Sequence, residues 1–356
     1  TLWGPGSETD ERMCFLPLCH VAERVIEVGR DCGGFRSYAL EVPAGVETLR
    51  LDLLDTDGDL DLLARAGAPI VTLGPSVELA QHPYGRETLV VHREADAIAR
   101  DETWWIDVVD PQDSERDQRF RLRASFAADP PADLLQLPAL TGPRAPEVVP
   151  AELLAVVELE TDHGVGSGTL VSADGWILTN AHVVEGREFP GDDVVVAVCL
   201  DPTRPPVEMF RGHVEFEDTV TDLALVRVRA GFYGQPLPPG YRFPELRGAQ
   251  GELPPIGTNL RIAGYPLTGG QGTRVSISLT RGIVAGYDRG PGGVLLKTDA
   301  EITNGNSGGA ALDDAGRLVG VPSATVENGS GQIGYVHPLA LLPAEWIAAS
   351  GLRFEH

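Results

Sequence analysis

The segment from Gly305 to Ala310 gathers small residues around one hydroxyl group. It reads Gly-Asn-Ser-Gly-Gly-Ala, and the hydroxyl belongs to Ser307. Glycines let the backbone turn tightly and let a carbonyl group approach closely. The amide N–H groups around such a serine can point at the oxygen that becomes negative during acyl transfer. The pattern therefore predicts that Ser307 is a nucleophile.

Two earlier segments offer the partners that a nucleophilic serine needs. Residues 179–184 read Thr-Asn-Ala-His-Val-Val and place His182 directly after an apolar run. Residues 221–226 read Thr-Asp-Leu-Ala-Leu-Val and place Asp222 at the start of another. A histidine can take the serine proton, and an aspartate can orient the imidazole and stabilise its cation. We therefore predict a catalytic triad of His182, Asp222 and Ser307.

The elements that position these residues are expected to be β-strands. After residue 150, short apolar segments are punctuated by Pro and Gly, which is typical of all-β folds. Many strands with Gly-rich turns over about 200 residues predict paired β-barrels. The final segment, 339–349, is expected to be a terminal helix. The expected strands are 153–159, 168–171, 176–179, 194–200, 223–228, 259–263, 294–298, 318–321 and 333–336.

This half of the chain resembles the trypsin-like serine proteases, and among them the bacterial HtrA/Deg type. The resemblance runs from about Leu153 to Pro338. It implies a double β-barrel of the chymotrypsin type, protein or peptide substrates, and no metal or cofactor for the chemistry. The five motifs that carry it, in order, are Gly166-Ser167-Gly168-Thr169-Leu170-Val171, 174–184, Asp222-Leu223-Ala224-Leu225-Val226, Thr298-Asp299-Ala300 and Gly305-Asn306-Ser307-Gly308-Gly309-Ala310.

The oxyanion hole follows from this resemblance and from the needs of acyl transfer. The backbone N–H groups of Gly305 and Ser307 are expected to form it, with Asn306 shaping the turn. Zymogen-activated relatives carry an aspartate where Asn306 stands, and that aspartate pairs with a newly cut N-terminal amine. Because Asn306 cannot make this ion pair, cleavage ahead of residue 153 is not expected to be the switch.

Substrate specificity at P1 has two interpretations. Glu301 stands six residues before Ser307, where trypsin-like proteases place the floor of the P1 pocket. A buried carboxylate there would favour Arg or Lys, because an unpaired buried charge is costly. Alternatively, Glu301 points elsewhere and the pocket accepts small aliphatic residues. By family position, the remaining walls are expected to include Thr303, Pro322, Ser323, Ala324 and Thr325.

Two other functions compete with a serine endopeptidase. Gly-x-Ser-x-Gly also fits the nucleophile elbow of α/β-hydrolases, but that fold needs its acid and histidine after the serine on alternating β and α units. Only His337 and His356 follow Ser307, and such units are absent from the pattern. The second alternative is a catalytically silent, protease-like binding protein that captures a partner through its N-terminal half.

The first half of the chain also predicts β-structure. Short alternating segments at 38–42, 48–53, 89–92, 104–108 and 120–124 indicate an antiparallel two-sheet sandwich. Residues 20–127 resemble the bacterial pre-peptidase C-terminal (PPC) domain through 42–45, 58–62 and 103–108. The resemblance implies an accessory role, such as binding a regulatory or recruiting partner.

An acidic loop in this half carries Asp55, Asp57, Asp59 and Asp61 around Gly58. Oxygen ligands on a tight turn suit a structural calcium ion. The alternative is a solvated turn between strands, since the loop lacks the spacing of an EF-hand. No other cofactor is expected.

Cysteine usage suggests one disulfide at most near the N-terminus. Cys14, Cys19 and Cys32 cluster there, and their connectivity cannot be deduced from spacing. Their spacing fits no zinc pattern well. Cys199 lies in an apolar run and is expected to be a buried thiol.

Length and proline content predict two domains. The chain has 356 residues, of which 42% are hydrophobic, and this suits two cores better than one. Proline recurs between 129 and 150 without apolar periodicity, which is typical of a semi-rigid linker. We therefore expect a sandwich domain at 1–128, with a Cys-containing extension at 1–20, then a linker at 129–150 and a protease domain at 151–356.

Charge and hydropathy exclude several partners. The chain has 52 acidic and 28 basic residues, a net charge of −24, so binding to nucleic acid or anionic membranes is not expected. No apolar run is long enough to span a membrane. Thr1 opens the sequence with no basic segment before an apolar stretch, so we expect a removed signal peptide or a trimmed N-terminus. Secretion or a periplasmic location is favoured over the cytoplasm.

Overall fold

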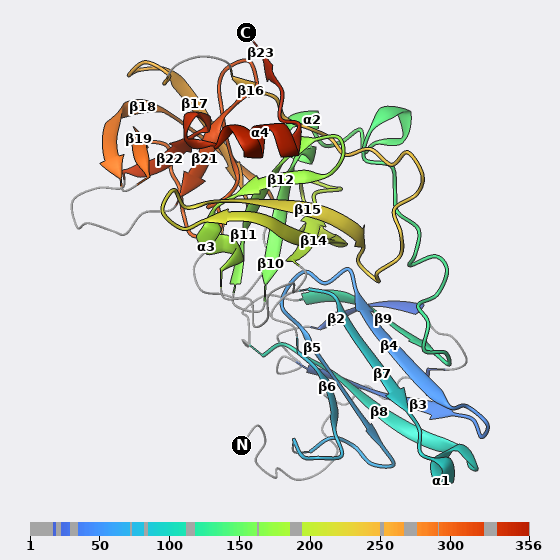
Figure 1. The fold of residues 1–356 in the computed structure, drawn as a ribbon. Coiled ribbons are helices and arrows are strands. Elements are labelled where there is room, and N and C mark those ends of the chain that lie inside the picture. The colour runs from blue at the N-terminus through green and yellow to red at the C-terminus, as the bar shows by residue number, and fades with distance from the viewer. Residues whose placement is uncertain are drawn as a thin grey trace. The chain divides into compact units, whose positions relative to one another are not determined.

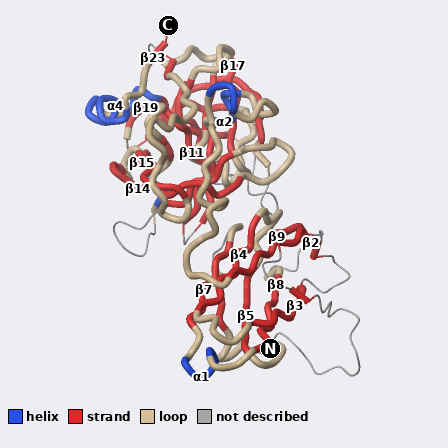
Figure 2. The backbone as a smooth tube through the Cα atoms, turned by 90° about the vertical axis from the view of Figure 1, so that its right-hand side faces the viewer, coloured by secondary structure: helices blue, strands red, loops and turns tan. Residues whose placement is uncertain are grey.

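The computed structural model describes most of the chain. The described residues are 17–18, 23–28, 35–71, 73–81, 85–111, 118–161, 164–185, 194–249, 253–266, 276–290, 292–323 and 333–355. They divide into two compact units, one ending at Leu134 and the other beginning at Leu135. The cysteines at 14, 19 and 32 lie outside the described residues. Strands dominate both units, and the helices are short (Figures 1 and 2).

The first unit contains two sheets, with strand orders β1-β3-β8-β5-β6 and β2-β9-β4-β7. All pairs in them are antiparallel except β1 with β3. The elements are β1 (Pro17–Leu18), β2 (Glu23–Val28), β3 (Phe35–Val42), β4 (Thr48–Leu54), β5 (Asp61–Ala66), β6 (Glu78–Ala80), β7 (Glu87–His92), α1 (Ala95–Ile98), β8 (Glu102–Val109) and β9 (Gln118–Ser125).

One apolar core joins the two sheets of this unit. It draws Tyr38 and Ile106 from the larger sheet and Leu51 and Phe120 from the smaller, all almost fully buried. Buried and more exposed side chains alternate along β9, as the period of two in a strand requires. The five strands expected in this half occur as β3, β4, β7, β8 and β9. The PPC resemblance itself stays a prediction.

The predicted linker is shorter than 129–150. Leu140 and Val149 are buried in the core of the second unit, and Leu137 packs against that core. Tyr241 Oη donates a hydrogen bond to the carbonyl of Pro138 over 2.6 Å. Residues 135–150 therefore belong to the second unit. Composition could not show this, because the few apolar residues there have no periodicity yet still find a hydrophobic surface.

The second unit contains two β-barrels. The first closes in the order β10-β11-β12-β15-β14-β13 and is drawn in green to yellow in Figure 1. Its elements are the 3-10 turn η2 (Gly142–Arg144), α2 (Ala151–Leu154), β10 (Val156–Thr161), β11 (Gly164–Ser172), β12 (Trp176–Thr179), α3 (Ala181–Val184), β13 (Val194–Val198), β14 (Val207–Asp218) and β15 (Leu223–Gly231).

The second barrel forms within an eight-stranded sheet of order β20-β17-β18-β19-β22-β21-β16-β23, where a β20–β21 pairing closes a ring of six strands. Its elements are β16 (Gly248–Ala249), β17 (Asn259–Gly264), β18 (Ser278–Gly290), β19 (Gly293–Thr298), β20 (Ala310–Leu312), β21 (Leu318–Ser323), β22 (Gly334–Pro338), η3 (Leu339–Leu341), α4 (Ala344–Ser350) and β23 (Phe354–Glu355). The unit is thus a double barrel of the chymotrypsin type.

Each of the nine strands predicted for this unit occurs, and five strands were not predicted, namely β14, β16, β18, β20 and β23. Leu153 lies in helix α2, so the first strand begins at Val156 rather than at 153. The long strands β14 and β18 were missed because polar residues and glycines interrupt their apolar pattern. The expected terminal helix divides into η3 and α4 around Pro343. No helix in the described part of the chain is long and apolar enough to cross a membrane.

Candidate active site

His182 and Asp222 are in direct contact within the first barrel. Helix α3 begins right after β12 and buries Ala181, Val183 and Val184, so His182 is the residue it exposes. The imidazole Nδ1 lies 2.9 Å from both carboxylate oxygens of Asp222. The backbone N–H of His182 also donates to Asp222 Oδ1 over 3.1 Å. This geometry assigns the Nδ1 proton to the carboxylate side and directs Nε2 away from it.

The electrostatics of Asp222 favour its ionised form. Burial acts to raise the pKa of this carboxyl, but the hydrogen bonds and charge of His182 outweigh burial and hold the pKa below its usual range. Asp222 has a φ of 52°, a left-handed conformation that is unusual for a residue with a side chain. Asn180 Nδ2 donates to the Asp222 carbonyl over 2.8 Å and helps to hold this backbone.

The loop that carries Ser307 is anchored on strand β11. The Ser167 N–H donates to the carbonyl of Ser307 over 2.8 Å, and Ser167 Oγ donates to the carbonyl of Gly305 over 2.7 Å. The Gly308 N–H donates to the carbonyl of Pro322 over 3.0 Å. Ser307 itself is 4% exposed. The loop is therefore fixed from the first barrel through Ser167 and from the second through Pro322.

Ser167 also links this loop to the segment that bears His182. Thr179 Oγ1 donates to the carbonyl of Ser167 over 2.7 Å, and Thr179 stands three residues before His182. The three predicted triad segments, far apart in the sequence, are thus linked by a chain of hydrogen bonds in which Ser167 is the intermediate. Ser307 connects through Ser167 to Thr179, and the helix that follows Thr179 contacts Asp222.

The structure separates the predicted pocket residues. Glu301 is exposed, and its carbonyl accepts a hydrogen bond from Thr280 Oγ1, so it is not the buried carboxylate that a basic P1 residue would require. Its neighbour Ile302 is buried instead. Thr303 holds the loop through its carbonyl, which accepts from the Asn306 N–H over 3.1 Å. Ala324 and Thr325 lie outside the described residues.

Pro322 and Ser323 end strand β21, beside β22. Ser323 pairs with Tyr335 in the register between these strands. Pro322 is buried, and Ser323 is partly exposed. Both residues therefore lie on the strand whose Pro322 carbonyl fixes Gly308.

The four acidic residues of the predicted calcium loop do not gather. Asp55 forms an ion pair with Arg121 over 3.0 Å, and Asp61 accepts a hydrogen bond from Gln81 over 2.9 Å. Across the described ranges, no three His, Cys, Asp or Glu side chains converge as a metal site would require. Asp55 is therefore paired with a guanidinium, and calcium binding by this loop stays a prediction.

Cys199 has the environment expected from its sequence. It is a free thiol, 1% exposed, next to the end of β13. Burial, with a smaller contribution from the charge of Asp201, raises the pKa of its thiol to about 11. A thiol with so high a pKa is a poor nucleophile at neutral pH.

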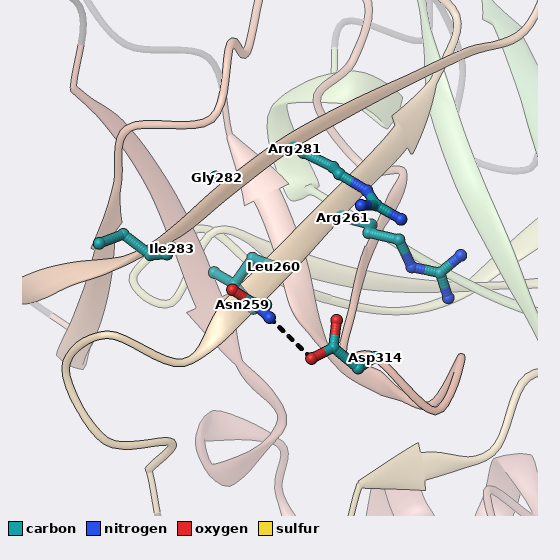
Figure 3. Close-up of a pocket in the computed structure, with 7 residues that line it drawn as sticks. All are labelled: Asn259, Leu260, Arg261, Arg281, Gly282, Ile283 and Asp314. Carbon is teal, nitrogen blue, oxygen red and sulfur yellow. Dashed lines mark hydrogen bonds between the residues drawn. The ribbon is translucent and has the colours of Figure 1, made fainter.

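A separate cavity of about 210 Å³ lies on the second barrel, lined by Asn259, Leu260, Arg261, Arg281, Gly282, Ile283 and Asp314. Figure 3 shows Arg261 and Arg281 extending to the same side, and Asn259 bonded to Asp314 over 2.8 Å. Arg261 is already occupied by a bidentate contact with Glu152. None of the lining residues is one of the predicted site residues.

Sequence reasoning missed three residues that support the site. Ser167 and Thr179 lie inside motifs that were recognised, but their roles depend on contacts across the fold. The third is His337, whose Nε2 lies 3.7 Å from Asp222 Oδ2. Its late position in the chain, after Ser307, gave no signal that it would meet the aspartate.

Comparisons with known proteins agree with this geometry. Residues 166–321 match a family model described as a trypsin-like peptidase domain. The chain is 32% identical over 186 residues to the putative serine protease HhoA of Synechocystis sp., covering 49% of this chain and 40% of HhoA. It is 30% identical over 179 residues to the probable periplasmic serine endoprotease DegP-like of Halomonas elongata, covering 49% of this chain and 32% of that protein.

Among solved structures, the serine endoprotease from Yersinia pestis is 28% identical, with a TM-score of 0.42, over 55% of this chain and 62% of that one. The chain spans less than half the length of the two curated relatives.

Proposed function

Residues 166–321 are a trypsin-like peptidase domain related to the HtrA-type serine proteases, and on that premise we propose that this chain is a serine endopeptidase acting on protein substrates. The observation that carries the proposal is the contact of His182 Nδ1 with both oxygens of Asp222 at 2.9 Å, on a segment hydrogen-bonded through Ser167 to the Ser307 loop.

In this mechanism Ser307 Oγ attacks the scissile carbonyl carbon while His182 Nε2 takes its proton. Asp222 holds the imidazole and stabilises the imidazolium. The amide N–H groups of Gly305 and Ser307 receive the oxyanion of the tetrahedral intermediate, and each such donor contributes about 3 kcal/mol. The C–N bond then breaks, and His182 gives its proton to the leaving amine. A water molecule activated by His182 next hydrolyses the ester, releasing the acid and restoring Ser307.

A fluorophosphonate probe tests the proposal directly. We expect the wild-type chain to be labelled on one serine, and Ser307→Ala to lose the label while unfolding at the same temperature. Ser350→Ala is the matched control, because Ser350 is a buried serine in helix α4 that is not one of the predicted site residues. If the folded wild type takes up no label under any condition, the silent binding protein becomes the better description.

The proposed P1 preference is for small aliphatic residues. Glu301 is exposed, so no buried carboxylate selects Arg or Lys. Ile302 is buried, and a Cβ on Gly334 would press against its side chain, which leaves an apolar and confined surface at this position. Chromogenic peptides ending in Arg, Ala, Val or Glu test this. Faster cleavage after Arg than after Val would instead support a P1 preference for basic residues.

We place the enzyme outside the cytoplasm, because the similar protein from Halomonas elongata is described as periplasmic. We further propose that the first unit is an accessory module that recruits a partner or regulates the peptidase. Cleavage rates of one protein substrate by the full chain and by residues 135–356, both first shown to be folded, test this second point. Equal rates for the two proteins would argue against an accessory role in cleavage of that substrate.

A further inference from the structure

The carboxylate of Asp222 has a second imidazole beside it. His337 lies on β22 of the second barrel, where it pairs with Val321 of β21. Its Nε2 is 3.7 Å from Asp222 Oδ2, and its ring also makes a hydrogen bond to the backbone of Thr221. Asp222 thus meets His182 from the first barrel and His337 from the second.

The hydrogen bonds of His337 identify its tautomer. The only backbone group that accepts from an imidazole N–H is a carbonyl, so the ring nitrogen facing Thr221 and Asp222 carries a proton. Within the described residues, the other nitrogen, Nδ1, is buried and has no hydrogen-bond partner. A proton on Nδ1 would therefore be an unsatisfied buried donor, which is costly. The arrangement favours the neutral ring with its proton on Nε2.

The charges around His337 agree with a neutral ring. Burial lowers the pKa of this imidazole, and the charge of His182 adds to that effect, while the charge of Asp222 and the Thr221 backbone act against it. The side chain is only 10% exposed. A neutral ring can lie beside Asp222, with its N–H dipole toward the carboxylate, without adding a cation that would compete with His182.

The segment that His337 contacts needs such support. Asp222 has a φ of 52°, a strained backbone for a residue with a side chain. On the first-barrel side, Asp218 Oδ1 accepts from the Val220 N–H, and Asn180 holds the Asp222 carbonyl. From the second barrel, His337 contacts the same backbone through its hydrogen bond to Thr221.

We propose that His337 is a positioning residue for the peptidase: its Nε2–H, donated to the Thr221 backbone across the junction of the two barrels and 3.7 Å from Asp222 Oδ2, holds the carboxylate that orients His182. This inference rests on the proposed function and adds a fourth side chain to its machinery. A residue that acts through Asp222 affects the chemical step rather than substrate binding.

Kinetics of three variants of the full chain test the proposal. His337→Leu removes the donor. We expect kcat to fall about 10- to 100-fold with KM unchanged, because small displacements of catalytic groups lower the rate by factors of that size. His337→Gln keeps an N–H in reach of the same acceptors and should recover most of kcat. His213→Leu, on β14, is the matched control and should match the wild type. Wild-type kinetics in His337→Leu, or equal loss in the Leu and Gln variants, would overturn the proposal.

The tautomer provides a test that needs no variant and no activity. In wild type with 15N-labelled histidine, we expect the His337 ring to be neutral at pH 7.5, with its proton on Nε2. A proton on Nδ1, or a cationic ring at neutral pH, would contradict the inference even if His337→Leu failed to fold. Absence of any fluorophosphonate labelling of the wild type would instead count against the proposed function, so the two failures are distinct.

Discussion

Ser167 Oγ donates a hydrogen bond to the carbonyl of Gly305 over 2.7 Å and accepts one from the Tyr265 N–H over 2.9 Å. Ser167 is fully buried on β11 of the first barrel, whereas Gly305 and Tyr265 belong to the second-barrel half of the unit. One hydroxyl group thus joins the nucleophile loop to both barrels. The backbone of the same residue binds Ser307 and Thr179, so the position of the loop depends on this strand.

Replacing Ser167 by Ala should loosen the nucleophile loop. The carbonyl of Gly305 and the N–H of Tyr265 would lose a buried partner, which costs about 1–3 kcal/mol for each group left unsatisfied. We expect phosphonylation by a fluorophosphonate to slow about 10- to 100-fold, since small displacements of a catalytic group have effects of that size. Ser278→Ala, which removes only a 3.4 Å contact with Gly264, is the control. Equal rates for the two variants would argue against this role.

Asp222→Asn should nearly abolish turnover while the fold persists. In the variant an NH2 donor replaces one of the two oxygens that lie 2.9 Å from the imidazole Nδ1, and the neutral side chain no longer stabilises an imidazolium. By analogy with other triads, kcat should fall about 10⁴-fold. Asp201→Asn changes an aspartate of similar type in a remote turn and should leave kcat unchanged. Stopped assays with a peptide substrate measure both, and a loss below about tenfold in Asp222→Asn would contradict the assignment.

Gly308→Ala should be more damaging than a glycine replacement elsewhere. Gly308 has a φ of 87°, and a Cβ there would overlap the carbonyl oxygen of Ser167 and the hydroxyl of Thr179. Gly234 has a similar φ of 79° but open space around it, so Gly234→Ala carries the backbone strain without the clash. We expect Gly308→Ala to lose labelling and Gly234→Ala to keep it. Fluorophosphonate labelling of both variants, read on a gel, shows whether the steric clash at Gly308 or the backbone strain alone causes the loss. Equal labelling of the two variants would contradict the expected effect of the clash.

Arg93 should be a major source of stability in the first unit. It is 6% exposed, and its guanidinium donates to the carbonyls of Pro43, Val46, Ala97 and Arg100 over 2.7–3.0 Å. Lysine cannot reach four acceptors in this planar arrangement. Arg93→Lys should lower the free energy of unfolding by about 2–4 kcal/mol, because hydrogen bonds from charged groups are worth about 1.5–3 kcal/mol each. Urea unfolding measures this, with the exposed Arg100→Lys expected to stay near wild type.

Asp107 should make the stability of the first unit depend on pH. Burial raises the pKa of its carboxyl to about 6, and the hydrogen bond from Ser37 offsets only part of this. The folded chain then binds more protons than the unfolded chain between pH 3.8 and about 6, so the free energy of unfolding falls as pH rises through this range. The full shift corresponds to roughly 3 kcal/mol.

Asp107→Asn isolates this contribution. The amide oxygen can still accept from Ser37, but it has no charge to bury. Urea unfolding of both proteins at a series of pH values should therefore show the variant gaining stability relative to the wild type as pH rises from about 4 to about 7. A difference that does not change with pH would mean that Asp107 titrates normally.

The strands that the sequence predicted best are those with uninterrupted β-branched and leucine residues. Strand β12 has the predicted bounds, Trp176–Thr179, and β15 begins at Leu223 as predicted. Strand β18 was not predicted because three glycines, Gly282, Gly286 and Gly290, and several charged residues interrupt its apolar pattern. Residues 135–150 were predicted to be part of a linker because their few apolar residues show no periodicity. Leu140 is nevertheless buried in the core of the second unit.

The identities of Ser307, His182 and Asp222, and the all-β class of both halves, follow from the sequence alone, because glycine-rich turns, apolar alternation and the order of the motifs are local properties of the chain. Tertiary structure alone decided that Glu301 is exposed, that Ser167 joins the barrels, and that His337 reaches Asp222. These depend on how two barrels close and meet. Contacts of that kind join residues more than a hundred positions apart, and no local pattern encodes them.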